Sequence, residues 1–280
     1  MKVGLALRVR YEAMVDVAVA AEENGYESVW LPEHLIWPVD FGGRSPHADG
    51  HPPVDPSIPT LDTLMVLLRL AGATQRVRLG TYVYNLALRH PFVSARAVQT
   101  LDVLSGGRVE LGVGAGWLAA EWAAAGLDFS TRGRRLDECI DVVRCLWRES
   151  TPSWSGEFFS FGPVKFEPKP LQPRIPVLVG GESDAALRRA ATRGDGWIGM
   201  NHDPVTVVDR VARLRELTIA ADRDPAEVTV TVGGAAPDDD AVAAFAAAGV
   251  DRLVIAPWRR TADAVAGLTE YARHIGLEVG

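Results

Sequence analysis

Eight short β-type segments alternate with longer helical segments along the chain, and this alternation restricts the possible folds more than any other sequence feature. Several of the β-type segments are nearly continuous apolar runs, as expected for parallel strands that are buried on both faces. The expected strands are Val3–Leu7, Ser28–Leu31, Val77–Val83, Arg108–Val113, Pro176–Val179, Gly196–Gly199, Val228–Val232 and Arg252–Ala256.

Each expected strand is followed by a helical pattern, as a closed (β/α)₈ barrel requires. The 280 residues suit one barrel, and we therefore expect a single α/β domain over residues 1–280. An open, doubly wound sheet has the same local pattern and is the structural alternative.

Two long segments interrupt the alternation. Residues 37–59 follow the second strand and are rich in Gly, Pro, His and Asp. Residues 150–173 precede the fifth strand and contain several aromatic residues and prolines. Loops of this length are usually functional or have structure of their own. The first is expected at the active-site rim of a barrel, and the second is expected to form a short hairpin or a subunit contact.

The composition excludes several classes of protein. With 29 Lys and Arg against 36 Asp and Glu, the chain lacks the cationic surface that nucleic-acid binding needs. No run reaches the roughly 18 apolar residues of a membrane-spanning helix, and the first ten residues do not resemble a signal peptide. Cys139 and Cys145 lie on different faces of one expected helix and cannot form a disulfide with each other. We expect a cytoplasmic protein.

A glycine series, Gly112-Val113-Gly114-Ala115-Gly116, ends the fourth expected strand. Glycines at this position let the backbone approach a ligand closely, although they serve equally for tight packing at the rim. The series is not a dinucleotide-binding fingerprint, because the third glycine of that motif is replaced by Trp117.

A second glycine pair, Gly180-Gly181, joins the fifth strand to a helix and is followed by Glu182 and Ser183. Ser183 is a candidate N-cap, and the free N–H groups of the first helical turn attract anions. This junction is a candidate phosphate-binding turn. An ordinary capped turn is the alternative.

Polar side chains follow the second and third strands. Glu33 and His34 come directly after the second strand, where a histidine can exchange protons near neutral pH. Tyr82, Val83 and Asn85 end the third strand. In a barrel these positions all lie at the active-site rim.

The loop after the second strand also contains His47, Asp49 and His51. Their spacing suggests zinc, but the surrounding Gly- and Pro-rich segment gives no rigid frame, and we expect no metal site. Sequence motifs of serine hydrolases, zinc metalloproteases and P-loop nucleotide-binding proteins are absent.

Taken together, the ordered segments resemble the luciferase-like monooxygenase superfamily, and in particular its branch of F420-dependent oxidoreductases. The segments that carry the resemblance are Glu33-His34, Gly80–Val83 with Arg89-His90-Pro91, Leu104–Arg108, Gly112–Trp117 with Glu121, and Pro176–Gly181 with Gly194–Trp197.

The resemblance implies a coenzyme with a tricyclic ring at the barrel mouth. It implies a non-prolyl cis peptide bond between Tyr82 and Val83 behind the ring, a coenzyme phosphate at Gly180-Gly181, and His34 near the centre of hydride transfer. Trp117 departs from the F420-dependent sugar-phosphate dehydrogenases, which have an acidic residue there. Their sugar-phosphate substrate is therefore not carried over to this chain.

The resulting hypothesis is an F420-dependent oxidoreductase that transfers a hydride to or from a small organic substrate. An FMN-dependent monooxygenase is the alternative, and a barrel that binds a coenzyme without catalysis is a third possibility. The expected site comprises two catalytic residues, Glu33 and His34, and the coenzyme-binding residues Tyr82, Val83, Asn85, Gly114, Ala115, Gly116, Gly180, Gly181, Glu182 and Ser183. By analogy with the family, the protein is expected to be a homodimer.

Overall fold

A computed structural model of the chain describes residues 1–39, 57 and 59–278. Its main sheet is a closed barrel of parallel strands in the order β1-β10-β9-β8-β7-β4-β3-β2, in which β1 pairs with both β10 and β2. The barrel strands are β1 (Lys2–Ala6), β2 (Ser28–Leu31), β3 (Arg78–Thr81), β4 (Val109–Val113), β7 (Val177–Gly180), β8 (Gly196–Met200), β9 (Thr229–Gly234) and β10 (Arg252–Ile255). The predicted barrel is therefore confirmed, and the open sheet is excluded.

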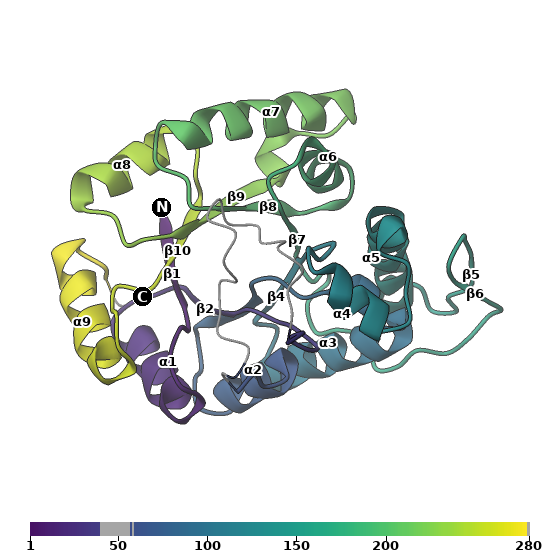
Figure 1. Cartoon of the computed structure of the whole chain (residues 1–280), viewed down its shortest axis with the longest axis horizontal. Helices are drawn as coiled ribbons and strands as arrows, with labels where there is room; N and C mark the ends of the chain where they lie inside the picture. Colours follow the sequence, from purple (N-terminus) through teal and green to yellow (C-terminus); the bar gives the residue numbers. More distant parts are fainter. Residues whose placement is uncertain (40–56, 58, 279–280) are drawn as a thin grey trace.

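Helices surround the barrel in chain order, from purple α1 to yellow α9 in Figure 1. They are α1 (Met14–Glu23), α2 (Thr63–Ala71), α3 (Pro91–Ser105), α4 (Ala119–Ala124), α5 (Arg132–Arg148), α6 (Asp184–Arg193), α7 (Thr206–Ala220), α8 (Asp239–Ala247) and α9 (Ala264–His274). Side-chain oxygens of Asp62, Ser183 and Asp238 accept backbone N–H groups at the starts of α2, α6 and α8. These N-caps explain where three of the helices begin.

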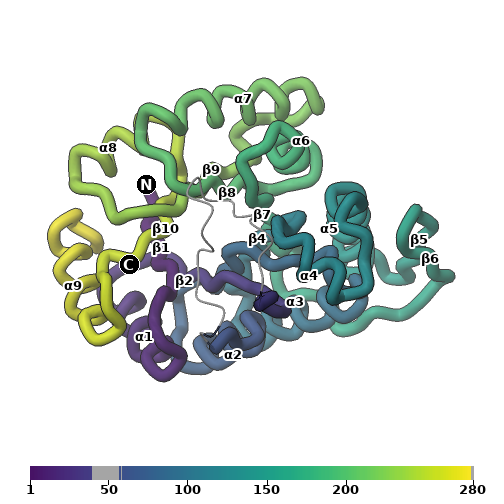
Figure 2. Tube along the Cα trace, in the orientation of Figure 1, coloured from purple at the N-terminus to yellow at the C-terminus, as the bar shows by residue number. Residues whose placement is uncertain are grey.

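The segment before β7 forms the expected hairpin, and Figure 2 shows it beyond α5, away from the barrel. Its strands are β5 (Trp154–Ser155) and β6 (Ser160–Phe161), which are antiparallel. Glu138 of α5 accepts hydrogen bonds from the Trp154 indole at 3.0 Å and from the backbone N–H of Phe159 at 2.9 Å. The hairpin is thus anchored to the outer helix layer.

Two cores hold the fold together. The larger core lies between the strands and the helices. A smaller one fills the barrel and consists of Ala6, Trp30, Tyr82, Leu178, Ile198 and Val254. At the amino-terminal ends of the strands, buried Arg252 pairs with Glu27 and Glu110. The barrel is therefore closed at that end by an ionic cluster.

Two further sequence predictions concern features outside the site. Cys139 and Cys145 are both free, as the prediction that they form no disulfide with each other requires, and both are buried. No helix within the described part of the chain is long and apolar enough to cross a membrane.

Candidate active site

The predicted site residues follow the carboxyl ends of β2, β3, β4 and β7. Because all barrel strands are parallel, these segments meet at one end of the barrel. In this fold, that end carries the active site. The structure therefore brings the candidate residues of four separate segments to the same rim.

His34 is held by a buried carboxylate from a different part of the chain. Its Nδ1 lies 3.2 Å from Oε2 of Glu121, which is on α4, and the Glu121 side chain is completely buried. The other oxygen of Glu121 accepts the backbone N–H of Leu35 at 2.6 Å. Nε2 of His34 makes no hydrogen bond to any described residue. The carboxylate thus fixes one ring nitrogen and leaves the other available.

Two tryptophans flank the same histidine. The ring of Trp37 lies 4.0 Å from the His34 ring, centroid to centroid, with a tilt of 35°. The ring of Trp117 approaches edge-on at 5.9 Å and 81°. The indole N–H of Trp37 donates to Thr60 Oγ1 at 3.0 Å. His34 therefore lies in an aromatic recess.

Glu33, the second predicted catalytic residue, has a different environment. Its carboxylate forms an ion pair with Arg89 and accepts the backbone N–H of Asn85 at 2.6 Å. The side chain of Asn85 points back to the carbonyl of Glu33 at 3.4 Å. Burial raises the pKa of Glu33, although the charge of Arg89 opposes that rise. Glu33 and Asn85 thus connect the β2 loop to the end of β3.

Tyr82 and Val83 lie where β3 ends, and the peptide bond between them is cis, as the resemblance implied. The Tyr82 side chain belongs to the smaller core inside the barrel, and its hydroxyl lies against β9. There the hydroxyl occupies the space that a Cβ atom on Gly233 would need. This hydroxyl is buried and has no hydrogen-bond partner among the described residues. Burial raises the pKa of Tyr82. Tyr82 therefore closes the barrel interior directly below the mouth.

Val83 explains two of the predicted coenzyme-binding glycines. A Cβ atom on Gly114 would lie 2.6 Å from Cγ2 of Val83, and one on Gly180 would lie 2.7 Å from its Cγ1. Both glycines are thus needed to accommodate Val83. Gly116 has a φ of 75°, which favours glycine. Ala115, which lies between Gly114 and Gly116, packs against the larger core between the strands and the helices. Packing accounts for this glycine series without a ligand.

The turn after β7 has the predicted cap. Ser183 Oγ accepts the backbone N–H of Ala186 at 3.2 Å, and Gly181 has a φ of 129°. The Glu182 carboxylate accepts the backbone N–H of Met200 and contacts Nε2 of His202, both at 2.8 Å. Because the cap takes the N–H of Ala186, the N–H groups of Asp184 and Ala185 are the anion-attracting feature of this turn.

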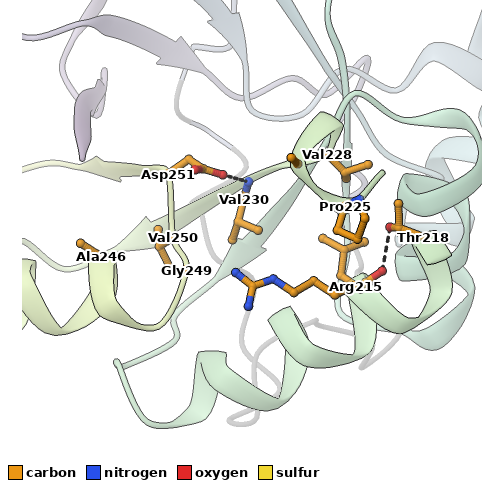
Figure 3. A pocket seen from close by; sticks show the side chains of 11 residues that line it. Arg215, Thr218, Pro225, Val228, Val230, Ala246, Gly249, Val250 and Asp251 are labelled. Carbon is orange, nitrogen blue, oxygen red and sulfur yellow. Dashed lines mark hydrogen bonds between the residues drawn. The ribbon is translucent and has the colours of Figure 1, made fainter. Parts of the chain in front are cut away.

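Two cavities lie at the opposite end of the strands. One, of about 390 Å³, is bordered by Arg215 and Thr218 of α7, by Val230 of β9 and by Gly249 before β10 (Figure 3). The other, of about 790 Å³, is lined in part by Arg78, Glu110 and Arg252. Both are at the amino-terminal end, where barrel enzymes do not carry out catalysis.

No cluster of three potential metal ligands occurs among the residues that the structure describes. His47, Asp49 and His51 lie outside these residues.

Sequence reasoning missed three contributors to this site: Glu121 as the partner of His34, Arg89 as the partner of Glu33, and Trp37. Glu121 and Arg89 stand out in the sequence only through the family resemblance. Glu121 lies 87 residues after His34 in the chain, and Arg89 lies 56 residues after Glu33. Only the closed barrel brings these segments together.

A family model described as luciferase-like monooxygenase matches residues 3–274 of the chain. The chain belongs to the luciferase-like monooxygenase family. Membership makes this luciferase-like protein an oxidoreductase, in agreement with the resemblance and with the barrel.

Two curated relatives show the range of this similarity. The luciferase-like protein is 34% identical over 276 residues to the uncharacterized protein Rv0953c of Mycobacterium tuberculosis, covering 96% of each chain. It is 32% identical over 238 residues to an F420-dependent glucose-6-phosphate dehydrogenase of Kineococcus radiotolerans, covering 76% of this chain and 65% of the relative.

Solved structures share the fold at lower identity. An F420-dependent secondary alcohol dehydrogenase in complex with an F420-acetone adduct superposes with a TM-score of 0.81 and 17% identity, covering 100% and 99% of the two chains. The monooxygenase RslO1 of Streptomyces bottropensis has a TM-score of 0.77 and 22% identity, covering 98% of each chain. These likenesses concern the fold alone.

Proposed function

We propose that this luciferase-like oxidoreductase uses the deazaflavin coenzyme F420 and transfers a hydride to or from a small organic substrate, with His34 moving the accompanying proton. One observation supports this proposal above the others: a buried carboxylate fixes Nδ1 of a rim histidine, while Nε2 has no partner among the described residues. The curated F420-dependent relative favours F420 as the coenzyme.

The residues at the mouth fit such a coenzyme. Tyr82 closes the barrel interior, so a flat ring has a floor to lie on, and the adjoining Val83 is fixed between Gly114 and Gly180. Ser183 caps α6, and the partial positive charge at the amino-terminal end of this helix can attract a phosphate. When bound, the coenzyme supplies or accepts the hydride.

The chain itself handles the proton. A carboxylate on Nδ1 favours the tautomer that carries its hydrogen there, so Nε2 of neutral His34 is a base for a substrate hydroxyl. Protonated His34 donates from the same atom to a substrate carbonyl oxygen. Acid–base catalysis of this kind contributes about 10²–10⁴-fold to a rate.

Glu33 has a positioning role in this proposal, since its carboxylate is buried against Arg89 and the backbone of Asn85. It holds the β2 loop, and with it His34, against the end of β3. Of the two predicted catalytic residues, only His34 is assigned a contact with the substrate.

The second candidate function is FMN-dependent monooxygenation. The fold of RslO1 supports it, and both coenzymes have a tricyclic ring and a phosphate. Sequence identity above 30% to an F420-dependent enzyme favours the first candidate.

Replacing His34 tests the proposed role. We expect His34→Ala to lower kcat at least about tenfold in an assay that follows reoxidation of reduced F420 by ketones, because the proton transfer is lost. His274→Ala, at the exposed end of α9, is the control and should leave kcat unchanged. Unaltered turnover by His34→Ala would remove His34 from the mechanism.

A further inference from the structure

We infer that this site takes a neutral carbonyl compound or alcohol with an aromatic or apolar body, and that Trp117 is the residue that selects it. This inference rests on the proposed function, because it names the substrate of the same site.

The first argument is the shape of the recess around His34. The Trp37 ring is tilted against the imidazole with 4.0 Å between the ring centroids, and the Trp117 ring is nearly perpendicular to the imidazole at 5.9 Å. Trp37 is fixed by its bond to Thr60. Trp117 follows Gly116, whose φ of 75° sets the direction of the turn. The Trp37 indole is therefore held beside the group that exchanges the proton, and the Trp117 indole lies beside the same group. Flat apolar groups pack favourably against such rings.

The second argument is the apolar character of the neighbouring loop. Leu35 and Ile36 follow His34 directly, and Leu61 lies just before α2. These side chains are 39%, 40% and 46% exposed. Exposed apolar side chains that gather at a site indicate that a ligand or partner with an apolar surface binds there. Leu35 and Ile36 lie within two residues of Trp37 in the chain, and Leu61 follows Thr60, which accepts the hydrogen bond of the Trp37 indole.

The third argument is the state of the charged groups beside His34. Glu121 is paired with His34, and Glu33 is paired with Arg89. His34 and Arg89 already pair with these two carboxylates, so neither of them is free to pair with an anionic substrate. The two carboxylates would also repel such a substrate. Trp117 also makes no hydrogen bond to another described residue, so its indole N–H is available to a neutral carbonyl oxygen.

Binding and turnover of matched compounds test this inference. Acetophenone and glucose 6-phosphate are compared as ligands by saturation-transfer NMR, with and without oxidised F420. Acetophenone with reduced F420, and glucose 6-phosphate with oxidised F420, are then compared as substrates. We expect the aromatic ketone to bind and to give the higher kcat/KM.

Trp117 variants give the residue-level test. Trp117→Ala should lower kcat/KM for acetophenone at least about tenfold through KM and should weaken its NMR signal, because the aromatic edge is lost. Trp117→Phe should retain most of both. Near-ultraviolet circular dichroism checks that each variant is folded.

The outcomes separate this inference from the proposed function. If F420 binds but glucose 6-phosphate is the better ligand and substrate, the substrate class is wrong and the proposed function stands. The same conclusion follows if Trp117→Ala leaves acetophenone binding and kcat/KM unchanged. If F420 does not bind, the proposed function fails, and the coenzyme-free NMR comparison of wild type with Trp117→Ala still decides the role of Trp117.

Discussion

Among single residues, Glu121 has the most direct influence on the chemistry, because its buried carboxylate contacts both Nδ1 of His34 and the backbone of Leu35. A buried carboxylate partner selects the tautomer of a histidine and stabilises its protonated form. The behaviour of His34 is therefore set by a residue on another element.

Glu121→Gln tests this dependence. Its amide can still accept the N–H of Leu35, but its NH₂ group favours the opposite His34 tautomer, so we expect kcat to fall roughly 10²-fold with little change in KM. The pH–rate profile should also shift. Glu138→Gln, the same change at the hairpin anchor, should leave that profile in place. A profile unaltered by Glu121→Gln would contradict the positioning role.

Tyr82 offers a test at the same scale. Its hydroxyl is buried without a partner among the described residues, and an unpartnered buried polar group costs about 1–3 kcal/mol. We expect Tyr82→Phe to raise the free energy of unfolding by about 1 kcal/mol in urea denaturation. Tyr26→Phe is the matched control with the opposite sign, because the Tyr26 hydroxyl donates to the Leu268 carbonyl at 2.8 Å. A destabilised Tyr82→Phe protein would refute this account of the hydroxyl.

The position of a side chain in the barrel could be predicted from the sequence where it lies next to a strand end. His34 and Ser183 could be found because their positions follow directly from the ends of β2 and β7. Glu121 could be singled out only through the family resemblance, since nothing near it in the sequence indicates a contact with His34. Such contacts depend on how the barrel closes.

At the scale of elements, the junctions of β3, β4 and β7 form one packed unit around Val83. Gly114 and Gly180 face this side chain from two sides. Glycines predicted to admit a coenzyme therefore also admit a neighbouring side chain. Gly181 is a poor site for mutation, because its φ of 129° strains any other residue.

Gly180→Ala tests this unit. The new Cβ would lie 2.7 Å from Cγ1 of Val83, so we expect a loss of about 1–3 kcal/mol in the free energy of unfolding, as for other overpacked sites. In a Val83→Ala background the same substitution should cost less. Equal costs in both backgrounds would show that the two positions do not pack together.

The elements themselves were largely predictable. All eight barrel strands were found with small shifts at their ends, because several of these buried parallel strands are nearly continuous apolar runs. The short helix α4 was missed, since its six residues follow the glycine series and have no side-chain cap. The hairpin was one of two expectations for residues 150–173 and is observed, whereas the subunit contact stays a prediction.

For the whole molecule, stability and function occupy opposite ends of the barrel. The candidate site lies at the carboxyl ends of the strands, and the ionic cluster of Arg252, Glu27 and Glu110 closes the amino-terminal ends. Changes in the cluster should therefore affect folding without altering substrate preference. The expected homodimer stays a prediction.

Arg252→Met tests the role of this cluster. Arg252 donates to Glu27 at 2.7 Å and to Glu110 at 2.8 Å, and its side chain is 5% exposed. Without Arg252, Glu27 keeps only Lys2 at 3.5 Å and Glu110 keeps only Arg78 as ion-pair partners in the described part of the chain, so we expect a loss of up to about 3–5 kcal/mol in urea denaturation. Arg260→Met, which breaks the exposed pair with Asp263, should cost less than about 1 kcal/mol. Similar losses in the two variants would contradict the assignment.

The same cluster predicts a pH dependence. Burial raises the pKa of Glu27, but hydrogen bonds and charge from Arg252 outweigh burial, and the net pKa is lowered from 4.5. Its stabilising contribution is therefore complete above pH 4.5 and is lost as the pH falls through the lower folded-state pKa. Glu27→Gln should flatten the decline of stability in acid. An unchanged decline would exclude Glu27 as its source.

Coenzyme binding tests the central claim most directly. The purified protein is titrated with F420 and, separately, with FMN, and binding is followed by fluorescence and absorbance. The proposed function predicts saturable binding of F420, at least about tenfold tighter than that of FMN, a difference of about 1.4 kcal/mol. Tighter binding of FMN, or no binding of either coenzyme, would contradict it.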